Sequence, residues 1–355
     1  MTIEMDPTNG SPWRPHVSVV LPIYNEARFI APCLDSVLAQ DYPADLMEVI
    51  VADGMSTDGT RDIVAGYARR DPRVRLISNP GRIVPTGLNA AIAEGRGDVV
   101  VRVDGHCAIA KDYVRQCVRH LQAGFDAVGG PLETIGETPH ARAIAMAMSS
   151  TFGVGNSAFR TVSDKTMVVD SVAFPAFTRS VLDKLGPFDE ELVRNQDDEF
   201  NYRLRKAGGR ILLAADVRSR YFSRSSMRSL WRQYFQYGYW KVRVLQKHPR
   251  QMCARQFVPP IFVAGLLLSA LLAPVVVPAQ WLLVAVAAAY LSISLLASLR
   301  VAGRDVRMFA ALPPIFATLH LGYGLGFLAG LVRFARGWRA QAADGSHASL
   351  GVSSN

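Results

Sequence analysis

Two long stretches without a charged residue constrain this chain more than any other feature. They run from Gln256 to Leu299 and from Met308 to Val332. A helix needs about 20 consecutive apolar residues to cross the hydrocarbon core of a bilayer, so the two stretches have room for three such helices. The expected membrane spans are about 257–277, 281–299 and 308–332, with a tight turn at 277–280 between the first two.

The positive charge of the chain favours a membrane surface over nucleic acid as its partner. The net charge is +9, and basic residues concentrate on both sides of the first two spans, where anionic headgroups would lie. They are Lys241, Arg243, Lys247, Arg250 and Arg255 before the spans, and Arg300, Arg304 and Arg307 after them. By the positive-inside rule both ends of this hairpin lie in the cytoplasm. No zinc-finger spacing or RNA-binding aromatic motif is present, so we expect no nucleic-acid partner.

The third span is harder to place. A full crossing leaves Arg333, Arg336 and Arg339 outside, against the positive-inside rule. The Pro313-Pro314 pair and the glycines that follow favour a broken, re-entrant or closely packed helix, and a third full span is the interpretation that we prefer. His320 is either a functional group within the membrane or a hydrogen-bonding partner of a neighbouring helix.

The first 255 residues alternate apolar strands with amphipathic helices. We expect strands at 17–26 (interrupted by Pro22), 46–52, 74–78 and 99–103, and helices at 29–38 (capped by Asn25), 61–69 and 85–94. Such alternation predicts an α/β fold with a doubly wound, mostly parallel sheet whose ligands bind at the carboxyl ends of the strands. No Cys-x-x-Cys pair and no apolar signal region occur, so we expect this part to stay in the reducing cytosol.

The strand at 99–103 leads directly into Asp104-Gly105-His106. A carboxylate and an imidazole two residues apart can reach one divalent cation, and this donor pair suits Mn²⁺ better than Mg²⁺. The alternative is an ordinary Asp-Gly turn with His106 on the surface. The residues by themselves leave both interpretations open.

Two further acidic sites follow the same logic. Asp53, after the second strand, can accept a hydrogen bond from a uracil ring or a ribose hydroxyl, or it can simply close an Asx turn. Asp197, Asp198 and Glu199 enter a helix together, which the helix dipole explains in part. One of these carboxylates can instead act as general base on an acceptor hydroxyl.

The motifs, taken in order, resemble family 2 glycosyltransferases with a GT-A fold. They are Val17-Ser-Val-Val-Leu-Pro-Ile-Tyr-Asn-Glu26, Asp53-Gly-Met-Ser-Thr-Asp-Gly-Thr60, Asp104-Gly-His106, Phe188-Asp-Glu190 and Gln196-Asp-Asp-Glu-Phe-Asn-Tyr-Arg-Leu204. The resemblance covers about residues 16–240. Within the family the chain is most similar to the bacterial succinoglycan-type glucosyltransferases, which also carry carboxyl-terminal membrane helices.

The resemblance implies an inverting transfer from a nucleotide-diphospho-sugar, commonly UDP-linked, with Mn²⁺ or Mg²⁺ as cofactor. Asp53 matches the base-binding Asp, Asp104 the first Asp of the DxD motif, and Asp197 the catalytic base. Further nucleotide-sugar contacts implied are Pro22, Tyr24, Glu26 and Gln233, with Asp198, Arg203 and Tyr237 as secondary candidates. His106 replaces the second carboxylate of DxD and would be a nitrogen ligand of the metal. Gln196 replaces a Glu before the base, and we expect Asp197 to ionise more easily as a result.

The expected organisation is a flexible arm (1–15), a GT-A catalytic domain (16–225), a basic aromatic helix at the membrane interface (226–255), a transmembrane region (256–335) and a flexible tail (336–355). The helix at 226–255 can equally be an amphipathic helix packed on the core. We expect transfer of a glucose-like sugar to a hydroxyl of a lipid-linked saccharide at the inner face of the bacterial cytoplasmic membrane, in exopolysaccharide or cell-surface glycan assembly alongside other assembly proteins. The alternatives are a polyprenyl-phosphate sugar synthase and a non-catalytic scaffold of such an assembly.

Overall fold

The computed structural model describes residues 13–155, 157–223, 226–336 and 338, and the chain divides into two compact units. The first unit comprises the chain up to Ile135 together with Asn156–Phe222, and the second comprises Gly136–Gly155 with the chain from Ser223 onward. A segment from within the expected catalytic domain is therefore grouped with the carboxyl-terminal helices. Most of the expected arm at 1–15 and tail at 336–355 lies outside the described residues.

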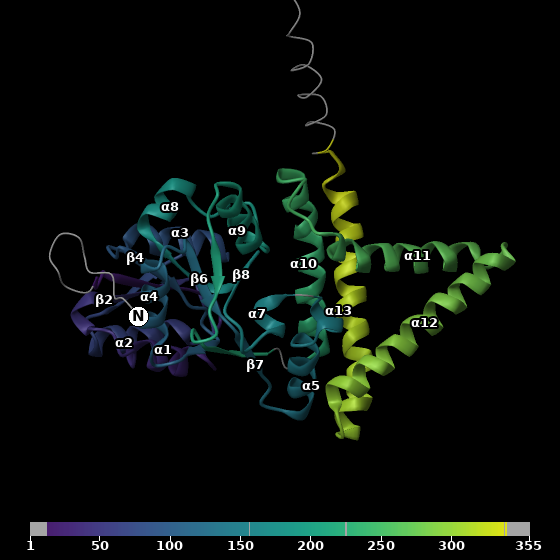
Figure 1. Cartoon of the computed structure of the whole chain (residues 1–355), viewed down its shortest axis with the longest axis horizontal. Helices are drawn as coiled ribbons and strands as arrows, with labels where there is room; N and C mark the ends of the chain where they lie inside the picture. The colour runs from purple at the N-terminus through teal and green to yellow at the C-terminus, as the bar shows by residue number, and fades with distance from the viewer. Residues whose placement is uncertain (1–12, 156, 224–225, 337, 339–355) are drawn as a thin grey trace, which may run out of the picture. The chain divides into compact units, whose positions relative to one another are not determined.

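The first unit is built on one eight-stranded sheet (Figure 1). Its strands are β1 (Val17–Ile23), β2 (Met47–Asp53), β3 (Val74–Ser78), β4 (Val99–Arg102), β6 (Ala127–Gly130), β8 (Met167–Val169), β9 (Ala173–Thr178) and β10 (Ile211–Leu213), in the order β3-β2-β1-β4-β9-β6-β10-β8. β1, β2, β3 and β4 run parallel, as do β6 and β10, whereas β9 and β8 are antiparallel to their neighbours. The expected GT-A-like α/β sheet is thus confirmed.

A smaller sheet and a set of helices complete this unit. The sheet pairs β5 (Cys107–Ile109), β11 (Ser219–Phe222) and β7 (Leu132–Ile135). The helices are α1 (Ile30–Leu38), η1 (Ala44–Leu46), α2 (Thr60–Arg70), α3 (Val84–Glu94), α4 (Tyr113–Gln122), α7 (Ala158–Thr161), α8 (Arg179–Leu185) and α9 (Gln196–Lys206). Strands β5, β7, β8 and β11 have only three or four residues each, too few to show a periodic pattern, and the sequence did not predict them as separate strands.

The core forms around the central strands. Every residue of β1 and β4 is buried, so these apolar runs pack on both faces, as expected for parallel strands covered by helices. The expected interruption at Pro22 is wrong, because β1 continues through it. The register of β1 with β4 ends at Val20, so a proline without an N–H is tolerated farther along the strand. Asn25 does not cap α1 either; it has φ +54°, and its side chain accepts a hydrogen bond from the Thr57 N–H.

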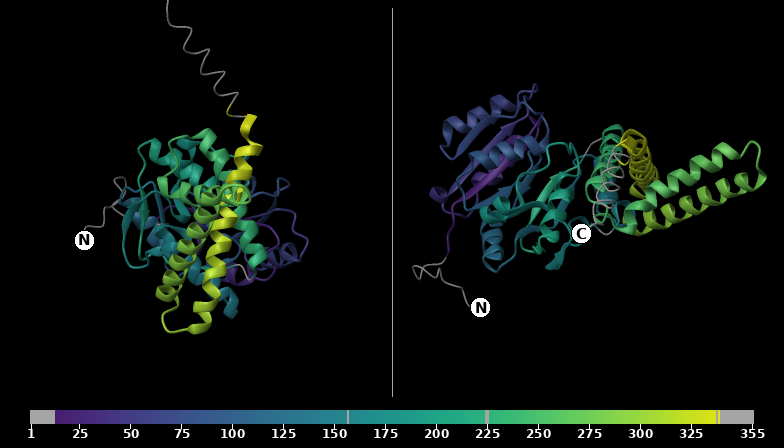
Figure 2. Two further views of the ribbon diagram at one scale, coloured as in Figure 1. Left: turned by 90° about the vertical axis from the view of Figure 1, so that its right-hand side faces the viewer. Right: turned by 90° about the horizontal axis from the view of Figure 1, so that it is seen from above.

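The second unit is helical. It contains α5 (Pro139–Met148), α6 (Thr151–Val154), α10 (Met227–Lys247), η2 (Ala254–Phe257), α11 (Val258–Leu272), α12 (Val277–Ala302) and α13 (Val306–Arg333). Three segments are long and apolar enough to cross a membrane: Ala254–Leu272, Val277–Ala302 and Val306–Arg333. The first two form a hairpin (Figure 2), whose turn precedes Val277 rather than following it, because Pro278 fits the first turn of a helix.

Helix α13 is continuous despite Pro313 and Pro314. Of the three expectations for this run, the structure shows the closely packed helix. Gly326 and Gly330 lie against the backbone of α10 at Phe235 and Tyr239, where an added Cβ would collide with a carbonyl oxygen. Close approach of two helix backbones over small residues is the usual packing mode of membrane helices. The packed-helix alternative for α10 therefore holds within this unit, and its place at a membrane interface stays a prediction.

Candidate active site

Asp53 is the last residue of β2, and its side chain is fully buried. Its carboxylate accepts hydrogen bonds from the Ser56 N–H at 3.2 and 3.3 Å and pairs with Arg61 Nη1 at 3.1 Å. Asp53 therefore closes a local turn, as the alternative interpretation expected, and it also forms an ion pair with Arg61. Gly54 suits the position after it, because a Cβ there would lie in tight contact with the carbonyl oxygen of Ile23, at 3.1 Å. The base-binding role of Asp53 stays a prediction.

Asp104 lies just beyond β4 and is held by the arginine that ends that strand. Arg102 Nε donates to Asp104 Oδ1 at 2.9 Å, and Arg102 Nη2 donates to Oδ2 at 3.3 Å. Arg102 Nη1 also donates to Asp197 Oδ1 at the start of α9. One guanidinium therefore links Asp104, the carboxylate expected to bind the sugar donor, to Asp197, the expected base. The two residues lie 93 positions apart along the chain (197 − 104).

Asp197 is the member of the acidic triplet that reaches this pair. Glu199 is bonded by Arg203 one turn along α9, at 2.7 and 3.0 Å, and Arg203 also donates to the carbonyl oxygen of Pro187 at 2.8 Å. Arg203 therefore braces the loop before α9, and the secondary role that we assigned to it stays untested. The side chain of Asp197 keeps 37 % of its surface exposed, so a substrate hydroxyl can approach it.

The pKa of the Asp197 carboxyl is raised above its usual value. Desolvation by the surrounding protein is the largest cause, the Arg102 guanidinium opposes it, and the carboxylates of Asp104 and Asp198 add to it. We expected the neutral Gln196, compared with a Glu there, to ease ionisation of Asp197, and that comparison stays a prediction. The net direction of the pKa of Asp197 is upward because desolvation and the neighbouring carboxylates together outweigh Arg102. A base with a raised pKa takes up a proton more readily.

His106 is fixed by Glu26 rather than left on the surface. Its Nδ1 lies 2.8 Å from Glu26 Oε1, its ring meets the edge of Tyr221, and about 15 % of its side chain is exposed. If Nδ1 of a neutral imidazole donates to this carboxylate, Nε2 is left with a lone pair. This carboxylate–histidine arrangement is common where the free nitrogen binds a metal. Glu26, which we expected to contact the nucleotide sugar, has this imidazole as its partner.

The remaining residues of the first β-strand motif are placed by the fold. Pro22 is buried within β1, and Tyr24, beyond the end of the strand, is 47 % exposed. Tyr24 is therefore available to a ligand, and the nucleotide-sugar-binding roles of Tyr24 and Pro22 stay predictions.

A divalent cation fits the donor chemistry here, although the protein alone does not complete a coordination shell. The described residues contain no group of three or more His, Cys, Asp or Glu side chains that could hold a metal. Asp104 and His106 supply one oxygen and one nitrogen donor. Magnesium-type ions are often held by one or two protein ligands, with substrate phosphates and water filling the other positions. The pair therefore fits a cation that arrives with a diphosphate.

Gln233 and Tyr237 belong to the second unit, on successive turns of α10. Gln233 Nε2 donates to the Tyr237 hydroxyl at 3.0 Å, and the Gln233 Oε1 atom is buried without a hydrogen-bond partner in the described part of the chain. Their assignment to the donor stays a prediction. His320, which we considered as an intramembrane functional group, lies between the Tyr290 hydroxyl and the carbonyl oxygen of Phe152, at 2.9 and 2.8 Å. Both ring nitrogens are thereby engaged, as the hydrogen-bonding alternative required.

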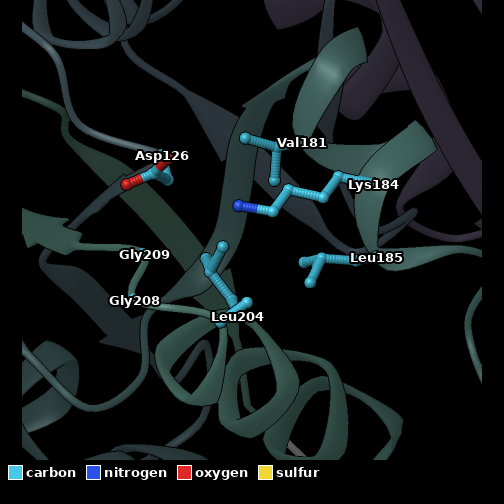
Figure 3. Close-up of a pocket in the computed structure, with 8 residues that line it drawn as sticks. Asp126, Val181, Lys184, Leu185, Leu204, Gly208 and Gly209 are labelled. Atoms are coloured by element: carbon cyan, nitrogen blue, oxygen red, sulfur yellow. The ribbon is translucent and has the colours of Figure 1, made fainter.

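A hollow lies at the amino ends of the strands of the main sheet, opposite to the candidate site (Figure 3). It is lined by Asp126, Val181, Lys184, Leu185, Leu204, Ala207, Gly208 and Gly209. Asp126 and Gly209 precede strands β6 and β10, so the hollow lies at the amino ends of the parallel strands. Asp53 and Asp104 follow the carboxyl ends, where open α/β sheets bind their ligands.

Arg102 is the site residue that sequence reasoning missed. A signal was present: an arginine interrupts a run of valines, and it stands two residues before Asp104, which places both on one face of an extended chain. A buried guanidinium needs partners, so its position alone predicted an ion pair. The partner from α9 could be found only in the folded chain.

Comparison with known proteins agrees with this geometry. The family model "Glycosyl transferase family 2" matches residues 18–186. The chain is 32 % identical over 329 residues to the succinoglycan biosynthesis protein ExoA of Rhizobium meliloti, covering 90 % of this chain and 96 % of that protein. It is 26 % identical to a Methanococcus voltae dolichyl N-acetyl-alpha-D-glucosaminyl phosphate 3-beta-D-2,3-diacetamido-2,3-dideoxy-beta-D-glucuronosyltransferase, covering 65 % of this chain and 74 % of that protein.

A solved structure shares the fold. The mannosyltransferase PcManGT of Pyrobaculum calidifontis, determined with GDP-Man and Mn²⁺, matches with a TM-score of 0.57 and 23 % identity, covering 93 % of this chain and 89 % of that one. The fold and the site thus define a GT-A-type sugar-transferring enzyme. The chain belongs to glycosyl transferase family 2, as the match to ExoA over nearly its whole length shows.

Proposed function

We propose that this glycosyltransferase moves a glucose-like sugar from a UDP-sugar, with inversion, to a hydroxyl of a lipid-linked saccharide at the cytoplasmic face of the bacterial inner membrane. The observation that carries the proposal is the array in which Arg102 joins Asp104 to Asp197. Donor-side and acceptor-side carboxylates meet there at one sheet edge. That arrangement suits a direct displacement. A non-catalytic scaffold would have no use for it.

In this mechanism Asp197 acts as the base. Its carboxylate takes the proton of the acceptor hydroxyl while that oxygen attacks the anomeric carbon from the face opposite the leaving nucleoside diphosphate. Asp53 binds the nucleoside, and Tyr24 lies exposed beside the same sheet edge. Asp104 and His106 would hold a divalent cation, which would supply positive charge to stabilise the departing diphosphate. The nitrogen donor favours Mn²⁺ over Mg²⁺.

A lipid-linked acceptor is supported by two independent observations. Three helices of the second unit are long and apolar enough to hold the enzyme in a membrane, where such acceptors reside. Among its relatives, the Methanococcus voltae enzyme is named for a dolichyl-linked sugar phosphate. ExoA is named for succinoglycan biosynthesis, which supports a role in exopolysaccharide assembly and contact with other assembly proteins.

A polyprenyl-phosphate sugar synthase is the second candidate. The observation in its favour is a 27 % identical relative, the dolichyl-phosphate beta-glucosyltransferase ALG5C of Trichomonas vaginalis, matched over 53 % of this chain. A phosphate acceptor brings no hydroxyl proton to remove. The accessible carboxylate of Asp197, whose side chain is 37 % exposed, would then have no proton to take, so we favour the hydroxyl acceptor.

Transfer assays with radiolabelled UDP-sugars test the proposal. Full-length enzyme in native membranes receives each donor with Mn²⁺, with Mg²⁺ or with chelator, and the lipid-extracted products are separated by size and by charge. Label on a lipid-linked saccharide supports the proposal, whereas label on a polyprenyl monophosphate supports the synthase. Lack of transfer and of UDP release from every donor, together with lack of nucleotide binding, would establish the scaffold instead.

A further inference from the structure

Arg102 occupies an unusual position for a charged residue. It ends β4, a strand otherwise made of valines, and only 6 % of its side chain is exposed. A guanidinium taken out of water is costly unless it is fully paired. Its partners are the two carboxylates on which the proposed reaction depends.

The pairing uses the shape of the guanidinium. Two nitrogens face both oxygens of Asp104, and the third turns to Asp197. Such a planar fork is specific to arginine, because a lysine ammonium acts as a point charge. It also means that each oxygen of Asp104 already accepts a hydrogen bond from a cation. A second cation arriving at Asp104 meets that positive charge.

We propose that Arg102 is a positioning residue that holds Asp197 toward the donor carboxylate and competes with the divalent cation for Asp104. This inference rests on the proposed function and deepens it. Arg102 offsets one of the two negative charges that Asp104 and Asp197 bring together, and it keeps the base from turning away. The cost is a weaker cation site, because Asp104 is shared. The nucleotide-sugar and its cation thus bind at Asp104, and the Arg102 side chain links Asp104 to the base, Asp197.

Replacement of Arg102 by Gln should change Mn²⁺ affinity and turnover in opposite directions. Replacing Arg102 by Gln removes a positive charge a few ångströms from the cation, so we expect Mn²⁺ to bind roughly tenfold more tightly. The same change frees Asp197, and a misplaced catalytic group costs on the order of 10²-fold in turnover. A residue with a merely structural role would weaken Mn²⁺ binding and transfer together.

The experiment measures Mn²⁺ binding directly, by electron paramagnetic resonance of the free ion, on detergent-solubilised full-length protein. Wild type, Arg102→Gln, Arg102→Lys and Asp104→Asn are compared, the last setting the background. Arg179→Gln is the matched control, because Arg179 donates only to the backbone carbonyls of Ile92, Gly95 and Gly97. Transfer from radiolabelled UDP-glucose gives kcat and the donor KM for each protein.

Tighter Mn²⁺ binding in Arg102→Gln with a lowered kcat and no rise in donor KM supports the proposal. Arg102→Lys keeps the positive charge but loses the planar fork, so Mn²⁺ binding should stay near that of wild type while kcat falls. That separation carries the test if the Gln variant does not accumulate. Unchanged or weaker Mn²⁺ binding in Arg102→Gln, an unchanged kcat in Arg102→Lys, or equal Mn²⁺ binding by wild type and Asp104→Asn overturns the proposal. The Mn²⁺ measurement does not depend on turnover, so it stands even if wild type transfers no sugar from any donor and the proposed function fails.

Discussion

The two units of this enzyme place opposite kinds of side chain on their surfaces. In the first unit, the valines of β1 and β4 are buried, and the charged groups at the strand ends meet in ion pairs. In the second, α12 buries Ser294 and Ser298 and exposes leucines along its length. Leu271 of α11 is 75 % exposed and Trp281 of α12 is 71 % exposed.

The difference reflects the solvent of each unit rather than a different folding rule. Apolar surface left in water costs about 25 cal/mol per Å², so the α11–α12 hairpin would be unstable there. In a bilayer the same surface is satisfied. The buried Ser298 hydroxyl donates to the carbonyl oxygen of Ser294 at 2.7 Å. We therefore propose that chemistry depends on the first unit and attachment to lipid on the second.

The sharpest test of this division removes the base. Asp197→Asn keeps the shape of the side chain but cannot accept the proton, so transfer should fall by roughly 10²–10⁴-fold. UDP binding, measured by calorimetry, should stay near wild type because the variant leaves Asp53 and Asp104 intact. Asp183→Asn on the exposed side of α8 serves as control. Normal turnover by the Asp197 variant would remove it from the mechanism.

A matched pair of leucine truncations compares the units directly. Leu88 of α3 is fully buried in the first unit, so Leu88→Ala should cost about 2–5 kcal/mol of unfolding free energy. Leu271→Ala should cost less than about 0.5 kcal/mol, because its side chain contacts apolar detergent in the folded and unfolded states alike. Denaturant unfolding of the solubilised enzyme measures both. Equal losses would contradict the assignment of α11 to a lipid environment.

The glycines of the second unit allow a finer test. Gly326→Ala should destabilise it by about 1–3 kcal/mol, since the new methyl group would collide with the backbone of Phe235. Gly265→Ala on α11 has open space around it and should be neutral or slightly stabilising. Thermal unfolding in detergent distinguishes the two. A similar loss in both variants would mean that backbone flexibility, not close packing, explains these glycines.

The smallest expected effect concerns pH. Asp197 must be deprotonated to act, and its pKa is raised, so kcat/KM should fall on acidification at a higher pH than for an ordinary aspartate. Asp198→Asn removes one of the carboxylates that raise this pKa, so the acidic limb should move to lower pH. Rate profiles of the two enzymes test the sign. If the acidic limb of the profile stays in place or moves to higher pH, Asp198 does not raise the pKa of Asp197.

Much of the fold could be predicted because its signals are local. The strands at 47–53, 74–78 and 99–102 are short apolar runs between turn residues, and the three membrane helices follow from length and lack of charge. The motifs around Asp53, Asp104 and Asp197 were sufficient to suggest the family. The strands β5, β7, β8 and β11 were not foreseen, because segments of three or four residues that are not continuous buried apolar runs give no clear pattern.

The sequence by itself determined the class of enzyme, its candidate carboxylates and its apolar helices, because each is encoded in neighbouring residues. Only the tertiary structure decided which groups meet. Arg102 finds Asp197 from α9, Glu26 finds His106, and the glycines of α13 find α10. Such partners are distant in sequence, and whether a charge is paired or free depends on where the packed chain brings its neighbours. The same packing, through desolvation, raises the pKa of Asp197 above that of an ordinary aspartate.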